Sequence, residues 1–115
     1  MSTPTIFERI LAGEIPCKKV LENEWCLAFH DITPQAPIHV LVIPKKKITN
    51  VAAANPEDAL QLGQLLLAAK QVAVILGVSE TGFRLVFNNG QDAGQSVDYL
   101  HCHVLGGREL AWPPG

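Results

Sequence analysis

The spacing of apolar residues along the chain predicts two helices. A short helix follows Thr5, which suits an N-cap, and it ends before Gly13. A long helix spans 56–76, with Asn55 at its N-cap and Gly77 as its stop. The apolar stripe of the short helix comprises Ile6, Phe7, Ile10 and Leu11, and that of the long helix Leu62, Leu66, Ala69, Val72 and Leu76.

Strands account for most of the remaining apolar residues. "CKKVLEN" and "WCLAFHD" are typical of a hairpin that turns near Asn23, and "IHVLVIP" is apolar enough for a central strand buried on both faces. "GFRLVFNN" and "VDYLHCHVLGG" are two further strands, separated by a glycine-bearing loop. Two helices and about five strands with hairpin-like links predict one α+β domain over residues 1–115, built on an antiparallel sheet.

Composition narrows the class of protein. The 115 residues are 48% apolar and 17% charged, which is globular, and a net charge of −2 gives no broad attraction to nucleic acid or to anionic membranes. The start of the chain lacks the features of a signal peptide, and no segment is a good membrane span. Cys17, Cys26 and Cys102 are odd in number and widely spaced, so we expect buried, reduced thiols in a cytoplasmic protein. The lysine run 45–47 is expected at a solvated strand end.

The last predicted strand carries the candidate chemistry. Side chains alternate along a strand, so Tyr99, His101 and His103 share one face together with Leu105. The opposite face is expected to enter the core through Leu100, Cys102 and Val104. Two imidazoles on one face of a hydrophobic strand require an explanation.

Three interpretations of the histidine pair compete. The two side chains can be structural histidines with satisfied hydrogen bonds. They can be metal ligands with His39 as a third, although no carboxylate or cysteine clearly completes that set. They can also perform phosphoryl chemistry, in which a neutral imidazole attacks phosphorus and its neighbour, if protonated, stabilises phosphate oxygens.

The loop before this strand favours the phosphoryl interpretation. "NNGQDAGQS" contains Gly90 and Gly94, which let backbone N–H groups converge on an anion. Asn88 and Ser96 add side-chain donors. A donor-rich loop that leads directly into a two-histidine strand face points to a phosphate ligand.

Four stretches together resemble the histidine-triad family, closest to the histidine-triad nucleotide-binding proteins that act as purine nucleoside phosphoramidases. They are "TIFERILAGEIPCKKV", "AFHDITPQAPIHVLVIPKK", "NNGQDAGQSV" and "HCHVLGGRELAWPPG", and they cover nearly the whole chain. The resemblance implies a histidine-triad-like fold, with a five-stranded antiparallel sheet, one long helix and one short helix. It also implies a homodimer in which the C-terminal tail with Trp112 approaches the partner's active site.

The resemblance implies a role for each residue of the site. His101 would be the nucleophile that attacks the α-phosphorus, and His103 a phosphate ligand. The phosphate loop would comprise Asn88, Gly94, Gln95 and Ser96, of which Ser96 also assists the departing amine, while His39 supports the motif. Asp31 would bind the ribose hydroxyls beside a base pocket lined by Ile6, Phe7, Ile10, Ile15, Phe29 and Ile32.

Tyr99 marks the departure from the family pattern, because it occupies the place of the first motif histidine. A phenol still donates one hydrogen bond, for which His39 is a candidate acceptor, so we expect activity to be retained. The implied function is hydrolysis of P–N or related bonds of purine nucleoside monophosphate derivatives, without a metal or other cofactor and without nucleic-acid or membrane partners. The alternatives are a catalytically weak purine-nucleotide-binding or scaffold module and, third, a zinc-binding adaptor.

Overall fold

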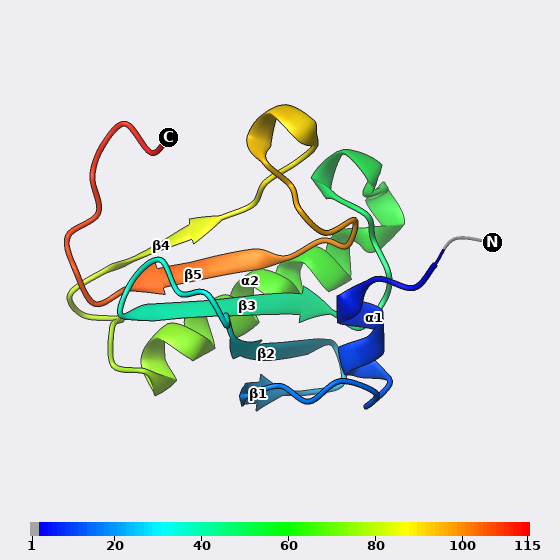
Figure 1. The fold of residues 1–115 in the computed structure, drawn as a ribbon, viewed down its shortest axis with the longest axis horizontal. Helices are drawn as coiled ribbons and strands as arrows, with labels where there is room; N and C mark the ends of the chain where they lie inside the picture. Colours follow the sequence, from blue (N-terminus) through cyan, green and yellow to red (C-terminus); the bar gives the residue numbers. More distant parts are fainter. Residues whose placement is uncertain (1–2) are drawn as a thin grey trace.

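The computed structural model describes residues 3–115 and contains one five-stranded sheet with two helices (Figure 1). All neighbouring strands are antiparallel, and their order across the sheet is β1-β2-β3-β5-β4. This arrangement confirms the predicted α+β fold. The elements are α1 (Ile6–Leu11), β1 (Lys19–Glu22), β2 (Cys26–His30), β3 (Ile38–Pro44), α2 (Ala59–Ile75), β4 (Phe83–Val86) and β5 (Cys102–Gly106).

Helix α1 begins at the residue that the sequence indicates. The Thr5 side chain accepts from the backbone N–H of Glu8 at 3.2 Å, and the Glu8 carboxylate accepts from the backbone N–H of Thr5 at 3.0 Å. This reciprocal capping box satisfies two backbone donors that the first turn would otherwise leave without partners. It fixes where α1 starts, and therefore where the Phe7 side chain packs against the sheet.

Helix α2 starts later than predicted and buries a slightly different stripe. A 3-10 turn over Pro56–Asp58 precedes it, so the α-helix begins at Ala59. The predicted stripe was wrong at Leu66, which is 49% exposed, because the helix turns Leu65 toward the sheet instead. The fully buried positions of the helix are Leu65, Ala68, Ala69, Val72 and Ala73.

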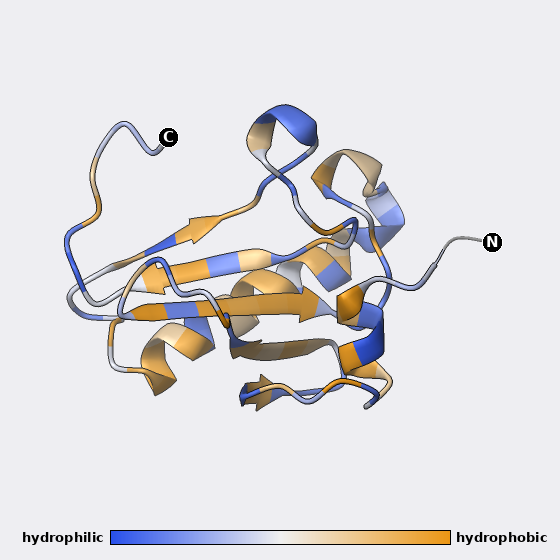
Figure 2. Ribbon diagram, viewed as in Figure 1, coloured by the Kyte–Doolittle hydropathy of each residue, from blue (hydrophilic) through white to orange (hydrophobic). Residues whose placement is uncertain are grey.

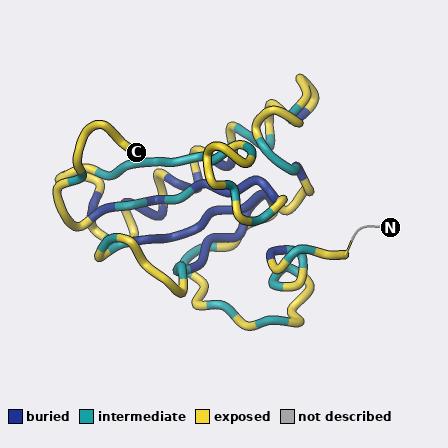
Figure 3. Tube along the Cα trace, turned by 45° about the horizontal axis from the view of Figure 1, so that its top comes forward, coloured by how far each residue is buried: buried dark blue, intermediate teal, exposed yellow. Residues whose placement is uncertain are grey.

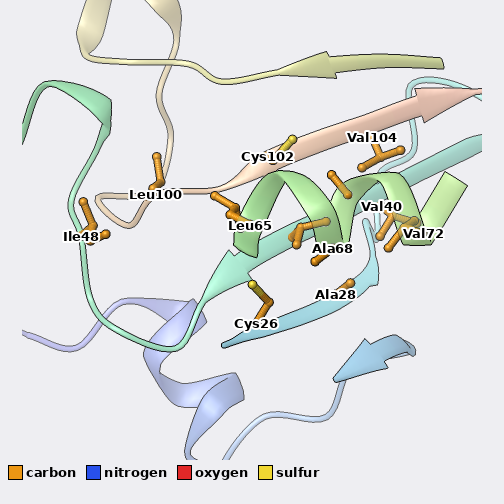
Figure 4. Packing of buried hydrophobic residues seen from close by; sticks show 12 residues of the cluster. Cys26, Ala28, Val40, Ile48, Leu65, Ala68, Val72, Leu100, Cys102 and Val104 are labelled. Carbon is orange, nitrogen blue, oxygen red and sulfur yellow. The ribbon is translucent and has the colours of Figure 1, made fainter. Parts of the chain in front are cut away.

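Helix α2 covers one face of the sheet (Figures 1 and 4). Its small and branched residues pack on apolar side chains of the three central strands, which form the larger core. Leu100, Cys102 and Val104 belong to this core, as the alternation along the last strand predicts. The strand contribution to the core comprises Cys26, Ala28, Val40, Val42, Cys102 and Val104.

The opposite face of the sheet carries a second, smaller core beneath α1. It consists of Phe7, Leu27, Phe29, Leu41, Ile43 and Tyr99. Strand β5 begins only at Cys102, so Tyr99 and His101 lie in the segment that leads into it, which bends over residues 97–99, rather than within the predicted strand. The histidines therefore emerge on the face that α2 leaves uncovered.

Hydropathy and burial both mark the central strands. Strands β3 and β5 are largely hydrophobic but are interrupted by hydrophilic bands (Figure 2), and the buried segments concentrate in the middle of the sheet (Figure 3). Strand β3 is buried on both faces from His39 to Pro44, as predicted. Among residues 3–115, no helix combines the length and apolar character needed to cross a lipid bilayer.

The structure modifies two expectations, one about the cysteines and one about the lysine run 45–47. Cys26 and Cys102 are buried and unbridged as expected, but Cys17 is only half-buried because it lies at the rim of a pocket. The lysine run 45–47 is exposed to solvent in part, yet each ammonium group is paired with a carboxylate. Lys47 lies 3.1 Å from Glu8 and so links the end of β3 to α1.

Candidate active site

Pairing of β3 with β5 brings three histidines together. His103 lies opposite Leu41 and His39 lies opposite Leu105, so His39 and His103 are diagonal neighbours on one face. Nε2 of His39 is 2.9 Å from Nδ1 of His103. The His101 ring centroid lies 5.0 Å from that of His103, which completes a contiguous row of imidazoles.

The orientation of His101 exposes one defined nitrogen. Its Nδ1 is 2.7 Å from the backbone carbonyl oxygen of Tyr99, two residues earlier. A carbonyl can only accept, so we assign the hydrogen of the neutral ring to Nδ1, which leaves a lone pair on Nε2. The ring is buried edge-on against Phe7, with centroids 5.0 Å apart. The arrangement suits a nucleophilic nitrogen with a fixed tautomer.

His103 presents a hydrogen-bonding nitrogen without a protein partner. Its Nε2 is buried and makes no hydrogen bond to any group within residues 3–115. Burial, helped by the neighbouring His101 and His39, lowers the pKa of His103 to about 4. The ring is therefore neutral at pH 7, so it can donate a hydrogen bond to a phosphate oxygen but brings no positive charge of its own. The sequence had suggested a protonated neighbour.

The Tyr99 side chain points away from the histidines. Its hydroxyl donates to the backbone carbonyl of Pro44 at the end of β3, so the expected bond to His39 is not formed. The side chain is only 1% exposed, and burial raises the pKa of Tyr99 to about 12. Its ring meets Phe7 edge-on at 6.1 Å. The phenol thus anchors the segment that carries His101, while its own backbone carbonyl orients the His101 ring.

A pocket of about 850 Å³ opens beside these histidines, between α1 and the end of β2. Phe7 lines the pocket and also touches His101, so pocket and nucleophile candidate are adjacent. The structure brings together every residue expected to bind the nucleoside: Ile6, Phe7, Ile10, Ile15, Phe29, Asp31 and Ile32. It adds lining residues that the sequence did not single out, namely Pro16, Cys17, Lys18, His30, Pro34 and Leu41.

Asp31 has contacts on both carboxylate oxygens. Oδ1 accepts from the backbone N–H of Thr33 at 2.8 Å, which closes the turn after β2. Oδ2 lies 3.5 Å from Nε2 of His39. The turn-forming role is therefore present in the fold, and the second oxygen faces the histidine row. No local sequence signal could have revealed this proximity, because it depends on how β2 and β3 pair.

The loop 88–96 precedes the segment that carries His101, and its residues differ in how far their side chains are free to bind a ligand. Gly90 and Gly94 adopt φ of 85° and 77°, a region that favours glycine. The Gln95 side chain is engaged at both ends: Oε1 accepts from Gly90 N–H at 2.8 Å, and Nε2 donates to the Thr49 and Val97 carbonyls. Gln95 therefore braces the loop. Ser96 is exposed and Asn88 is half-buried.

Two further features bear on ligands and partners. Donor atoms of Asp31, His39 and His103 all lie within 4.8 Å of one another, so the fold supplies the carboxylate that the metal interpretation lacked in the sequence. Trp112, in the C-terminal tail beyond β5, is 82% exposed. In one copy of the chain this indole has no surface on which to bury its ring.

Comparisons of the sequence and of the structure with known proteins point to the same family. A model of the HIT domain matches residues 12–110. An uncharacterised HIT-like protein of Synechocystis sp. is 55% identical over the full length of both chains. A HIT family hydrolase from Legionella pneumophila superposes with a TM-score of 0.95 at 47% identity, over 97% of this chain and all of that one.

A histidine triad nucleotide-binding protein from Candida albicans superposes with a TM-score of 0.81 at 33% identity. That match covers 96% of this chain and 83% of the other. Sequence and fold therefore agree over almost the whole domain, and the chain belongs to the HIT domain family.

Proposed function

We propose that the chain is a nucleotide-binding hydrolase that cleaves P–N or related bonds of purine nucleoside monophosphate derivatives through a nucleotidyl intermediate on His101. The observation that carries the proposal is the 2.7 Å bond between His101 Nδ1 and the Tyr99 carbonyl, beside an apolar pocket. A histidine held in this tautomer offers Nε2 to an electrophile. The hydrolase and the nucleotide-binding protein named above support the class of reaction.

In the first step Nε2 of His101 attacks the phosphorus. The P–Nε2 bond forms as the P–N bond to the amine breaks, and the amine leaves with a proton from solvent, for which the exposed Ser96 hydroxyl is the candidate relay in the loop. The nucleotidylated imidazole becomes cationic. Its Nδ1–H then donates to the Tyr99 carbonyl as a charge-assisted hydrogen bond, which stabilises the intermediate.

In the second step water attacks the phosphorus of the intermediate. The P–O bond forms as the P–Nε2 bond breaks, one water proton is released, and His101 returns to its starting tautomer. The products are the amine and the nucleoside monophosphate. No oxidant, reductant or further reactant is required.

Stabilisation of the developing charge falls to groups with hydrogen atoms to donate. Nε2–H of His103 lacks a protein partner and can meet a non-bridging phosphate oxygen. Asn88 and Ser96 in the loop are proposed as two further side-chain donors, and Gly90 and Gly94 adopt positive φ angles that let the loop backbone turn. Removal of one such donor costs about 10²–10³ in rate in other enzymes.

The decisive experiment compares wild type with His101→Ala on an adenosine phosphoramidate. We expect turnover by the wild type and none by the variant, while mass spectrometry of rapidly quenched wild-type reactions detects a nucleotidyl adduct on His101. Adenosine monophosphate binding and the thermal midpoint serve as controls for folding. Equal rates in the two proteins would remove His101 from the mechanism.

The alternative function is a nucleotide-binding module, because the pocket can bind a nucleotide without any hydrolysis. It predicts that wild type binds adenosine monophosphate but neither releases the amine nor forms an adduct. Tyr99→His tests the same point from the other side. A large gain in rate in that variant would indicate that Tyr99 had weakened the chemistry.

We also propose that two copies of the chain form a homodimer. Trp112 is 82% exposed, and Leu60, Leu67 and Val74 are exposed at seven-residue intervals along α2, so they form one apolar line on the helix. Burial of such side chains against a second copy would remove them from water. Light scattering after size-exclusion chromatography should give twice the chain mass of 12.5 kDa, whereas a monomer at micromolar concentration would contradict the proposal.

A further inference from the structure

The backbone amide of Gln35 touches the histidine row. Its N–H donates to Nδ1 of His39 at 3.0 Å. A backbone amide can only donate, so Nδ1 of His39 must accept and cannot carry a hydrogen. An imidazole that accepts at Nδ1 carries only one ring hydrogen, so the ring is neutral. The one hydrogen of that neutral ring is therefore on Nε2.

This assignment propagates to the next histidine. Nε2 of His39 is 2.9 Å from Nδ1 of His103, so a hydrogen on the first nitrogen requires a lone pair on the second. Neutral His103 must then carry its hydrogen on Nε2, the nitrogen that has no protein partner among the described residues. A single amide outside the row thus determines which atom of His103 can donate.

The residue that carries this amide is held from several directions. Arg108 Nη2 donates to the Gln35 carbonyl at 2.9 Å, and the Gln35 side chain donates to the Thr33 carbonyl at 3.1 Å. Gly107, with φ of 89°, leaves no room for a Cβ atom, which would lie 2.9 Å from Pro37. The segment after β5 therefore packs tightly on the loop before β3 and fixes the Gln35 peptide against His39.

The same geometry bears on metal binding. Asp31 Oδ2, His39 Nε2 and His103 Nδ1 are close enough to ligate one ion. A metal on Nε2 of His39 would force the ring hydrogen onto Nδ1, where it would face the Gln35 N–H at 3.0 Å. Histidine ligands normally donate their other ring N–H to an acceptor, and here that place is taken by a donor.

We propose that Gln35 is a positioning residue whose backbone amide sets the tautomers of His39 and His103, and so reserves the row for hydrogen-bond donation rather than for a transition-metal ion. Its relevance to turnover rests on the proposed function. The tautomers and the metal affinity do not, so they can be measured whether or not the chain turns over a phosphoramidate.

The test compares two variants that both lose the Gln35 side chain but differ in the backbone N–H. Gln35→Pro removes both the backbone N–H and the side-chain amide. Gln35→Ala removes the side-chain amide but keeps the backbone N–H. Long-range ¹H–¹⁵N spectra, assigned with His39→Asn and His103→Asn, report each tautomer. In wild type and Gln35→Ala we expect His39 and His103 with hydrogen on Nε2, and His101 with hydrogen on Nδ1. In Gln35→Pro we expect mixed tautomers for His39 and His103.

Calorimetric titration with Zn²⁺ alone provides the second measurement. Gln35→Pro should bind Zn²⁺ at least about tenfold more tightly than Gln35→Ala, equivalent to 1.4 kcal/mol. The added substitution His103→Asn should abolish that gain, which separates this site from the cysteines. A hydrogen on Nδ1 of His39 in the wild type would overturn the proposal even if Gln35→Pro fails to fold. So would equal tautomers and equal Zn²⁺ affinity in the folded Pro and Ala variants.

Discussion

Tyr99 and His101 are linked twice, once through the backbone and once through packing. The Tyr99 carbonyl accepts from Nδ1 of His101 at 2.7 Å, and both rings pack edge-on against Phe7. The phenol itself is directed elsewhere, to the Pro44 carbonyl. The side chain of Tyr99 therefore acts on the shape of the segment, while its backbone acts on the imidazole.

Tyr99→Phe should lower stability more than it lowers activity. The variant keeps the ring and the backbone carbonyl but leaves the buried Pro44 carbonyl without its donor, which costs about 1–3 kcal/mol. Urea unfolding and phosphoramidate turnover on the same preparation measure the two effects. A large loss of kcat at unchanged unfolding free energy would show instead that the phenol takes part in the chemistry.

Ile32→Ala should weaken nucleotide binding without changing stability. Ile32 lines the pocket yet is 95% exposed, so its side chain contributes almost no burial to the fold. Ile75→Ala, at a 48% exposed position at the end of α2, is a matched control for loss of an exposed aliphatic group. Calorimetric titration with adenosine monophosphate should detect weaker binding for Ile32→Ala only, and equal affinities for the two variants would argue against a ligand contact at Ile32.

Asp31→Asn should separate the turn from ribose recognition. The Asn oxygen can still accept from Thr33 N–H, so the turn after β2 should persist and the thermal midpoint should change little. Loss of the carboxylate should reduce affinity for adenosine monophosphate by about tenfold, or about 1.4 kcal/mol. The 2′-deoxy nucleotide should then bind wild type and variant nearly equally. If the variant loses the same factor toward both nucleotides, Asp31 does not contact the 2′-hydroxyl.

His103 should make stability fall in acid. Its folded pKa of about 4 lies below the ordinary value of 6.5, so between these values the unfolded chain binds a proton that the native chain excludes. Stability from this source is complete above about pH 6.5 and is lost as the pH falls toward 4, by about 3 kcal/mol. The slope of unfolding free energy against pH should be shallower in His103→Asn, and identical slopes would contradict the burial of a neutral imidazole.

Ser96→Ala should slow turnover without weakening the fold. Ser96 is exposed in the loop before the histidines, and its hydroxyl is the proposed donor to the departing amine. The effect should therefore grow as the amine becomes more basic and harder to expel. Ser79→Ala, at an exposed turn, is the matched control. Equal slowing for acidic and basic leaving amines would remove Ser96 from proton donation.

Local patterns in the sequence were sufficient for elements whose determinants are contiguous. The N-cap at Thr5, the apolar run of β3 and the alternation of Leu100, Cys102 and Val104 each follow from neighbouring residues. The resemblance of long stretches to one family named the pocket residues, and the fold gathers all seven of them. The local predictions succeeded because helix, strand and capping preferences operate within a few residues.

Tertiary structure alone decided the contacts that define the chemistry. The Tyr99 hydroxyl meets Pro44 across 55 positions, and His39 meets His103 across 64, distances over which no periodicity carries information. The contact between Arg108 and Gln35 also joins residues far apart in the sequence, and the burial that keeps His103 neutral likewise depends on the tertiary fold. The sequence supplied two imidazoles close together along the chain, whereas strand pairing and desolvation determined which nitrogen of each ring carries the hydrogen.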